Sequence, residues 1–153
     1  MEKELNKINN TDVIVVQALT RDLSNHEVSD MNNRINQVVD QALTKANKVV
    51  VNTIVNREDK RDIGAKSELV NAYVKYHYIN NENVIVCDND NLRDRKFRLP
   101  DGIHLTQHGT SIFANNMKYK IAEALKINVI KKEFTRRGPR YNSRHDFFGG
   151  NYG

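Results

Sequence analysis

One pair of residues has the types and the spacing needed for acid–base chemistry. Asp101 precedes His104 by three positions in the segment DGIHLT (101–106), which leads into an expected helix. A tight turn over this spacing would let the carboxylate accept the Nδ1 hydrogen of the imidazole and hold Nε2 outward as a general base. Gly102 favours such a turn because it tolerates a positive φ. Taken alone, the pattern has a second interpretation, a turn Asp followed by a His that precedes a helix.

Other residues capable of chemistry have structural interpretations that suit their surroundings. His104 and His108 stand four apart, as two zinc ligands on a helix do, but no third ligand follows at a matching spacing, so we expect no metal and no cofactor. Ser111 lacks the glycine that completes a nucleophile elbow and is expected to be a helix residue. Cys87, the only cysteine, lies in an apolar run, which favours an unreactive buried thiol and excludes an internal disulfide. The acidic run 88–91 lacks the later residues of a calcium loop and predicts a turn.

Apolar runs that alternate with amphipathic segments predict the elements that position the Asp–His pair. Three β-branched runs predict buried strands over 13–19, 48–55 and 83–88. Apolar residues spaced i, i+3, i+4 and i+7 predict helices over 25–46, 63–79 and 109–125. Strands separated by helices imply right-handed crossovers and a parallel sheet covered on both faces, which is an α/β fold. Ligands of such sheets gather at the carboxyl ends of the strands.

Length and charge indicate one folded domain followed by a basic tail. The chain has 153 residues, and we divide it into a lead (1–10), a domain (11–127) and a tail (128–153). The 24 Lys and Arg against 19 Asp and Glu give a net charge of +5, and most of this excess lies in residues 131–153. Such a tail, rich in Gly, Arg and aromatic residues, is expected to be disordered and could neutralise phosphates and stack bases. Its candidate RNA contacts are Lys131, Lys132, Arg136, Arg137, Arg140 and Arg144.

The sequence also predicts where the chain resides. No apolar run approaches the roughly 20 residues that a membrane span requires. The start, MEKELNKINN, lacks the apolar core of a secretory signal. These features predict a cytoplasmic protein without a membrane span.

The segment DGIHLTQHGTSIFANNMKYKIAEAL (101–125) resembles the last conserved block of the SGNH hydrolases, the GDSL-type esterases and lipases. In that family the Asp and His of D-x-x-H complete a Ser-His-Asp triad. The similarity extends over about residues 11–126, where TDVIVVQALTRDL lies at the position of the strand leading into the G-x-N-D block and Asn71 matches a common Asn. The resemblance implies a flavodoxin-like α/β/α fold of three layers, a carboxylic ester substrate, and catalytic roles for Asp101 and His104.

The family pattern is incomplete in this chain. The chain contains no Gly-Asp-Ser sequence. In the family this block, which carries the nucleophilic serine, follows the first strand, and that strand lies upstream of every segment that this chain resembles. At the G-x-N-D position, Leu19 replaces the Gly and Arg21 replaces the Asn that would bind the oxyanion. Thr20, Arg21 and Asp22 therefore mark the oxyanion region, and of these only Asp22 matches the pattern. These departures predict an N-terminally incomplete domain that keeps the Asp–His dyad but is inactive as written.

Two functions from different classes remain open on the sequence. One is an SGNH-like ester hydrolase domain that would act on an acyl ester if an upstream half supplied the serine. The other is a non-catalytic binding module whose tail contacts RNA or an acidic partner. In the family, further strands precede the one matched by 13–19. Their loss would leave 13–19 at the edge of the sheet and predicts self-association through that strand.

Overall fold

The computed structural model describes residues 11–17 and 22–129. Within them, strands β1 (Thr11–Gln17), β2 (Ala46–Asn52) and β3 (Val84–Cys87) form one sheet in the order β1-β2-β3. Both neighbouring pairs are parallel, and the register aligns Val16 of β1 with Val51 of β2 and Val86 of β3. The α/β class and the parallel sheet predicted from the sequence are thus confirmed.

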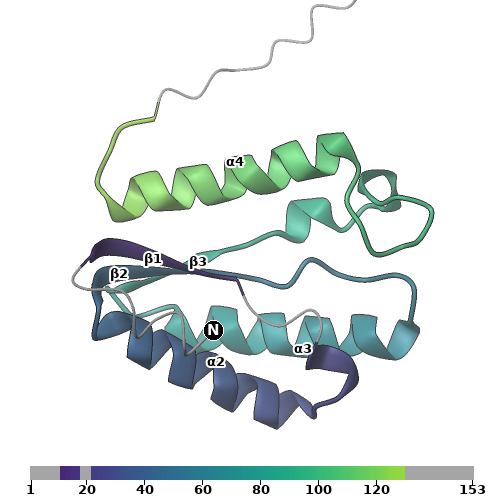
Figure 1. Cartoon of the computed structure of the whole chain (residues 1–153), viewed down its shortest axis with the longest axis horizontal. Coiled ribbons are helices and arrows are strands. Elements are labelled where there is room, and N and C mark those ends of the chain that lie inside the picture. Colours follow the sequence, from purple (N-terminus) through teal and green to yellow (C-terminus); the bar gives the residue numbers. More distant parts are fainter. Residues whose placement is uncertain (1–10, 18–21, 130–153) are drawn as a thin grey trace, which may run out of the picture.

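Three helices cover the two faces of this sheet unequally. Helices α2 (Val28–Leu43) and α3 (Arg61–Tyr78) lie on one face, and α4 (Gln107–Ala124) lies on the other (Figure 1). Right-handed crossovers that step in one direction across a sheet place successive helices on the same face, which accounts for α2 and α3. Helix α4 follows the last strand and returns over the opposite face. None of these helices is long and apolar enough to cross a membrane.

The hydrophobic core is likewise divided unequally between the two faces of the sheet. A large cluster fills the space between the sheet and helices α2 and α3 and includes the buried Val49 and Val51 of β2. A smaller cluster beneath α4 contains Val50 and Cys87. Of the apolar residues of α4 that the periodicity predicts as core, Ala124 is buried, but Ile112, Phe113, Met117 and Ile121 are only half-buried and Leu125 is 39% exposed. One helix is too narrow to cover this face of the sheet.

The end of β2 differs from the sequence prediction because side chains replace strand pairing. The apolar run predicts a strand to residue 55, but β2 ends at Asn52. The N–H of Ile54 donates to Asn71 Oδ1 at 2.7 Å, and Asn71 Nδ2 donates to the Ile54 carbonyl at 2.8 Å. A side chain of α3 therefore satisfies the backbone that a longer strand would have paired.

The first helix also begins later than predicted. Residues Asp22–Ser24 form a short 3₁₀ helix, η1, and α2 begins at Val28. Its N-cap is Glu27, which makes no side-chain capping hydrogen bond. The sequence prediction of helix from residue 25 is wrong at this end, because the turn of η1 separates β1 from the helix.

Several sequence predictions fall on residues that the structure does not describe, namely 1–10, 18–21 and 130–153. They include the last residues of the first expected strand, two oxyanion-region residues (Thr20 and Arg21) and the six basic residues of the tail. Those predictions stay predictions.

Candidate functional site

The Asp101–His104 pair forms the tight turn that its spacing predicts. His104 Nδ1 lies 2.5 Å from Asp101 Oδ2. The other carboxylate oxygen, Asp101 Oδ1, accepts the backbone N–H groups of Ile103 at 2.9 Å and of His104 at 3.0 Å. Gly102 has a φ of +70°, the left-handed conformation that glycine adopts without strain. One carboxylate therefore fixes both the backbone of the turn and the imidazole ring.

The ionisation of Asp101 determines which ring nitrogen of His104 faces it as a hydrogen-bond donor. The hydrogen bond from His104 lowers the pKa of Asp101 to about 2, and the two backbone N–H donors add to the effect. An ionised carboxylate only accepts hydrogen bonds, so in the neutral ring Nδ1 carries the hydrogen and Nε2 keeps a free lone pair. The His104 side chain is 72% exposed, and Asp101 is its only ring hydrogen-bond partner in the described part of the chain. The result is an oriented base that is open to solvent.

The turn lies at the tip of a loop that packs against the start of α4. Backbone hydrogen bonds between residues 97–99 and 104–106 close the loop. The Thr106 hydroxyl caps α4 by accepting the N–H of Gly109 at 3.1 Å. A Cβ on Gly109 would lie 2.7 Å from the Phe97 carbonyl oxygen, closer than real Cβ atoms approach. Glycine at this position therefore lets the helix and the loop meet.

The loop after β2 holds the turn from the side of the sheet. Glu58 N–H donates to the Gly102 carbonyl at 3.0 Å, and a Cβ on Gly102 would lie 3.1 Å from the backbone nitrogen of Asp59. Arg98 is 6% exposed and donates Nε and Nη2 to the Asn56 carbonyl at 3.0 and 2.7 Å. The dyad is thus joined to the carboxyl end of the central strand, where ligands of parallel sheets bind.

Buried polar atoms without partners gather at this same end of the sheet. Asn52, the last residue of β2, is 4% exposed, and neither its amide nitrogen nor its amide oxygen is hydrogen-bonded. Asn56 Oδ1 and Arg98 Nη1 are also buried without a partner. Among the described residues, only Asn32 Oδ1 on α2 shares this property elsewhere. Each such atom costs roughly 1–3 kcal/mol, and native proteins tolerate that cost most often at functional sites.

The remaining oxyanion-region residue in the described part, Asp22, does not join the dyad. It opens η1, and its carbonyl accepts the N–H of Asn25 at 3.0 Å. No hydrogen bond or ion pair links its carboxylate to Asp101 or His104 in the described part of the chain.

The other reactive side chains have structural roles, as the sequence predicts. The Ser111 hydroxyl donates to the Gln107 carbonyl within α4 at 3.0 Å. Burial raises the pKa of the Cys87 thiol to about 11, so it stays protonated and unreactive. The ring of His108 packs on Phe97, with ring centroids 5.5 Å apart. No group of three or more His, Cys, Asp or Glu side chains able to hold a metal ion occurs in the described ranges.

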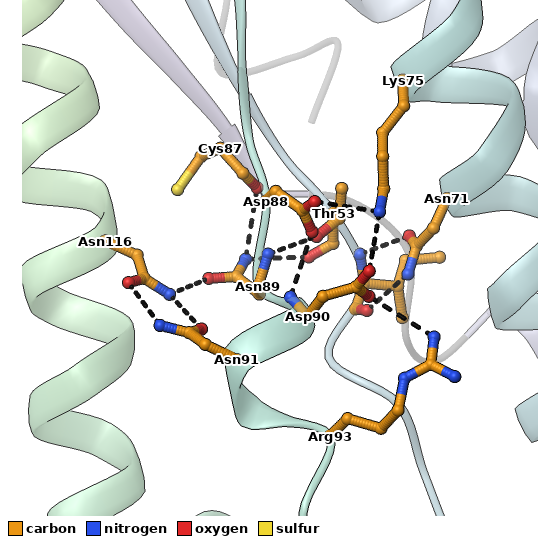
Figure 2. Close-up of polar contacts among 11 residues, drawn as sticks. Thr53, Asn71, Lys75, Cys87, Asp88, Asn89, Asp90, Asn91, Arg93 and Asn116 are labelled. Atoms are coloured by element: carbon orange, nitrogen blue, oxygen red, sulfur yellow. Dashed lines mark hydrogen bonds and ion pairs between the residues drawn. The ribbon is translucent and has the colours of Figure 1, made fainter.

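Polar residues after β3 form a network that ties the sheet to the helices (Figure 2). Asn89 is buried; its N–H donates to Thr53 Oγ1 at 2.9 Å and its Nδ2 to the Thr53 carbonyl at 3.1 Å. Asn116 of α4 donates to Asn89 Oδ1 at 2.9 Å and to Asn91 Oδ1 at 2.8 Å. Residues 88–91 thus form the turn that the sequence predicts.

A lysine of α3 completes the network. Lys75 Nζ lies 2.9 Å from both Asp88 Oδ2 and Asp90 Oδ2. The hydrogen bond with Asp90, aided by that with Asp88, raises the pKa of Lys75, and the same contact lowers the pKa of Asp90. Both carboxylates are therefore ion-paired with Lys75.

Sequence reasoning missed the residues that brace the dyad. Residues 56–62 look like an ordinary polar loop, yet Arg57 binds Asp59 through both carboxylate oxygens, at 2.9 and 2.6 Å. The available signals were an Arg and an Asp two residues apart after a buried strand, and a lone Arg98 between the apolar Phe97 and Leu99. Neither signal specifies a partner.

Comparison with known proteins adds no relative to this geometry. No protein-family model matches the chain, and no curated protein matches it. The resemblance to SGNH hydrolases therefore stays an expectation from the sequence.

Proposed function

We propose that residues 11–127 form an SGNH-hydrolase-like domain that holds the acid–base pair of a carboxylic ester hydrolase. The observation that supports this most is the Asp101–His104 pair, with Nδ1 bound to the carboxylate and Nε2 exposed. Its place, after the last strand and directly before the last helix, is the place of the D-x-x-H block in that family. The buried polar atoms around Asn52 that lack hydrogen-bond partners lie at the same end of the sheet and support a functional site there.

In such a reaction the pair would act on a serine hydroxyl. The serine oxygen attacks the acyl carbonyl while His104 Nε2 takes its proton, and the imidazolium later returns that proton to the leaving alcohol oxygen. Asp101 holds the ring in the required tautomer and stabilises the imidazolium. No hydroxyl or thiol of the described residues is hydrogen-bonded to the His104 ring. The oxyanion positions of the sequence also read Leu19 and Arg21.

The chain alone is therefore expected not to hydrolyse esters above background. Loss of one oxyanion donor already removes about 10²–10³ in rate from a hydrolase, and here the nucleophile is missing as well. The test compares hydrolysis of p-nitrophenyl acetate by the native chain and by His104→Ala. Equal, near-background rates support the proposal. A native rate well above that of the variant would show that Ser24, Thr20 or Ser111 serves as nucleophile and would overturn the inactivity.

A second candidate function follows from the charge distribution of the sequence. Residues 131–153 carry six basic side chains against two acidic ones and contain five aromatic residues. We propose that this segment, if the domain is a binding module, contacts RNA or another acidic partner chiefly through phosphates or carboxylates. Affinity for RNA should then fall steeply with rising salt and be lost on deletion of 131–153. RNA binding that survives the deletion would assign it to the domain instead.

The position of β1 supports a proposed partner. Strand β1 pairs only with β2 among the described strands. We propose that the chain associates with itself through this edge, as an uncovered apolar strand is a template for pairing.

A further inference from the structure

Helix α3 carries apolar side chains on the face that is turned away from the sheet. Its buried residues, among them Val70 and Val74, belong to the core between helix and sheet. With 3.6 residues per turn, the opposite side of the helix is formed by a set of residues that are all apolar and all exposed: Ala65, Leu69, Ala72, Tyr76 and, at the C-cap, Ile79. The three large ones are 59% (Leu69), 84% (Tyr76) and 74% (Ile79) exposed. Single exposed apolar residues are ordinary, whereas a contiguous set marks an interaction surface.

The spacing of these five residues is that of a seam along which two helices pack. They follow one another in alternating steps of four and three positions, at 65, 69, 72, 76 and 79. Apolar residues repeated at this interval keep to one side of a helix and insert between the side chains of a partner helix. We call this set of residues the α3 stripe.

The neighbouring helix provides a comparison within the same layer. Helix α2 lies beside α3 on the same face of the sheet (Figure 1). Its exposed residues are all polar or charged: Ser29, Asp30, Asn33, Arg34, Gln37 and Asp40. The outer face of α2 is therefore suited to water, whereas that of α3 is suited to an apolar partner.

We propose that the α3 stripe binds the same stripe of a second copy of this chain, with the two helices antiparallel. Leu69 packs against Ala72 of the second copy, and Tyr76 packs against Ala65 of the second copy. Each contact occurs twice, because the two-fold axis of such a pair brings the same surface of both copies together. This interface is separate from the self-association through β1 proposed above, since α3 covers a face of the sheet and β1 lies at its edge.

The alternation of large and small residues along the stripe determines the direction of the second helix. In a parallel pair, equivalent residues meet across the axis, so Tyr76 would face Tyr76 and Ala72 would face Ala72. The tyrosines would then hold the helices apart and leave gaps at the alanines, which close packing does not tolerate. In the antiparallel pair each of Leu69 and Tyr76 faces an alanine, so the helices approach evenly along the stripe.

The charges beside the stripe favour the same register. Glu68 and Lys75 flank it on one side, and 52% and 36% of their side chains are exposed. In the antiparallel pair Glu68 lies beside Lys75 of the second copy. Both are already ion-paired within their own chain, so this contact fixes the register more than it strengthens binding. The alternative register, with Leu69 opposite Ile79, would bring the two Lys75 side chains together, and like charges at an interface disfavour it.

Sedimentation of the full chain over a hundredfold range of concentration tests the proposal. A Val15→Lys chain, in which a lysine blocks the β1 edge, should still form a dimer. That dimer should dissociate on dilution, because one helix pair is small compared with a standard interface. Adding Leu69→Lys should weaken it at least about tenfold, because the charge would be buried against Ala72 of the second copy. Ile127→Lys is the matched control: Ile127 is 57% exposed, follows α4 on the other face of the sheet, and should leave dimerisation unchanged when replaced.

Disulfide trapping tests the register. A Leu69→Cys chain mixed with an Ala72→Cys chain should cross-link faster than either chain alone, while the native chain, whose Cys87 is buried, should not cross-link. Faster cross-linking of Ala72→Cys with Tyr76→Cys would indicate the alternative register and overturn this geometry.

The same measurements separate this interface from association through β1. A Val15→Lys chain that is monomeric at every concentration, or a dimer that Leu69→Lys leaves intact, would overturn the α3 interface. A native chain that is monomeric throughout would overturn both interfaces. None of these results bears on the ester hydrolase proposal.

Discussion

Two groups of polar side chains at the carboxyl end of the sheet show how similar residues acquire different roles. The network after β3 contains Asn89, Asp90 and Lys75, and each is bonded to side chains or backbone of neighbouring elements. The turn before α4 contains Asp101 and His104, which bond to each other and to their own backbone. The first group is bonded to neighbouring elements of the fold. The second presents a ring nitrogen to solvent.

The difference lies in burial and in the number of elements joined. Asn89 is buried and links the end of β3 to the segment after β2 and to α4. His104 is exposed and sits on a turn that other residues hold in place, among them Arg98 and Gly109. A polar residue that joins several elements stabilises the fold. One that is oriented but joins none is available for chemistry.

The largest loss of stability is expected on replacing Asn71, whose side chain binds the backbone that follows β2. Asn71→Ala removes both hydrogen bonds to Ile54 and leaves its buried N–H and C=O unpaired. Each unpaired group costs roughly 1–3 kcal/mol, so the free energy of unfolding should fall by about 2–4 kcal/mol in urea denaturation. Asn91→Ala is the control, because Asn91 is exposed and bonds only to the Asn116 side chain; its cost should stay below about 1 kcal/mol. Equal costs would show that the bonds of Asn71 to the Ile54 backbone stabilise the fold no more than an exposed pair of side chains does.

Much of the fold could be predicted because its signals are local. The runs around Val15, Val50 and Ile85 have the apolar, β-branched composition of buried strands, and the helical stripes have the right period. The D-x-x-H spacing and Gly102 likewise determined the turn, since its contacts lie within four consecutive residues. Predictions of this kind need no knowledge of distant partners.

The remaining features depend on contacts far apart in the sequence. The end of β2 is set by Asn71, and the dyad is braced by Arg98 through a carbonyl 42 residues away. Nothing in the sequence around either residue indicates which distant residue its side chain will bind. The incomplete burial of α4 is also a property of the assembled layers, because its amphipathic pattern is that of a packed helix. Leu69, which the same periodicity would place on the inner side of α3, is 59% exposed.

The pKa values of the carboxyl groups in an acid titration distinguish the two groups further. The pKa of Asp101 is about 2 and that of Asp90 is lowered by Lys75, both below the ordinary value of about 3.9. A lowered pKa in the folded state means that the ionised carboxylate stabilises the fold above the unfolded pKa and that this stabilisation is lost as pH falls through the folded pKa. Carboxyl NMR titration should show His104→Ala raising the pKa of Asp101 alone and Lys75→Met raising that of Asp90 alone. A variant that shifts both would show that the two groups are coupled.

The smallest change in stability, and the most direct test of the turn, is expected from Asp101→Asn. The amide oxygen can still accept the backbone N–H groups of Ile103 and His104, so the turn should persist and the unfolding midpoint should move less than in Asn71→Ala. The amide nitrogen, however, would face His104 Nδ1 as a donor, which favours the tautomer that carries its hydrogen on Nε2. Imidazole ¹⁵N spectra of the neutral ring should therefore show Nδ1–H in the native chain and Nε2–H in the variant. Asp88→Asn, in the network, should leave the His104 spectrum unchanged. A native ring that carries its hydrogen on Nε2 would remove the outward base and with it the ester hydrolase proposal, because a nitrogen that already holds a hydrogen cannot accept a proton from serine.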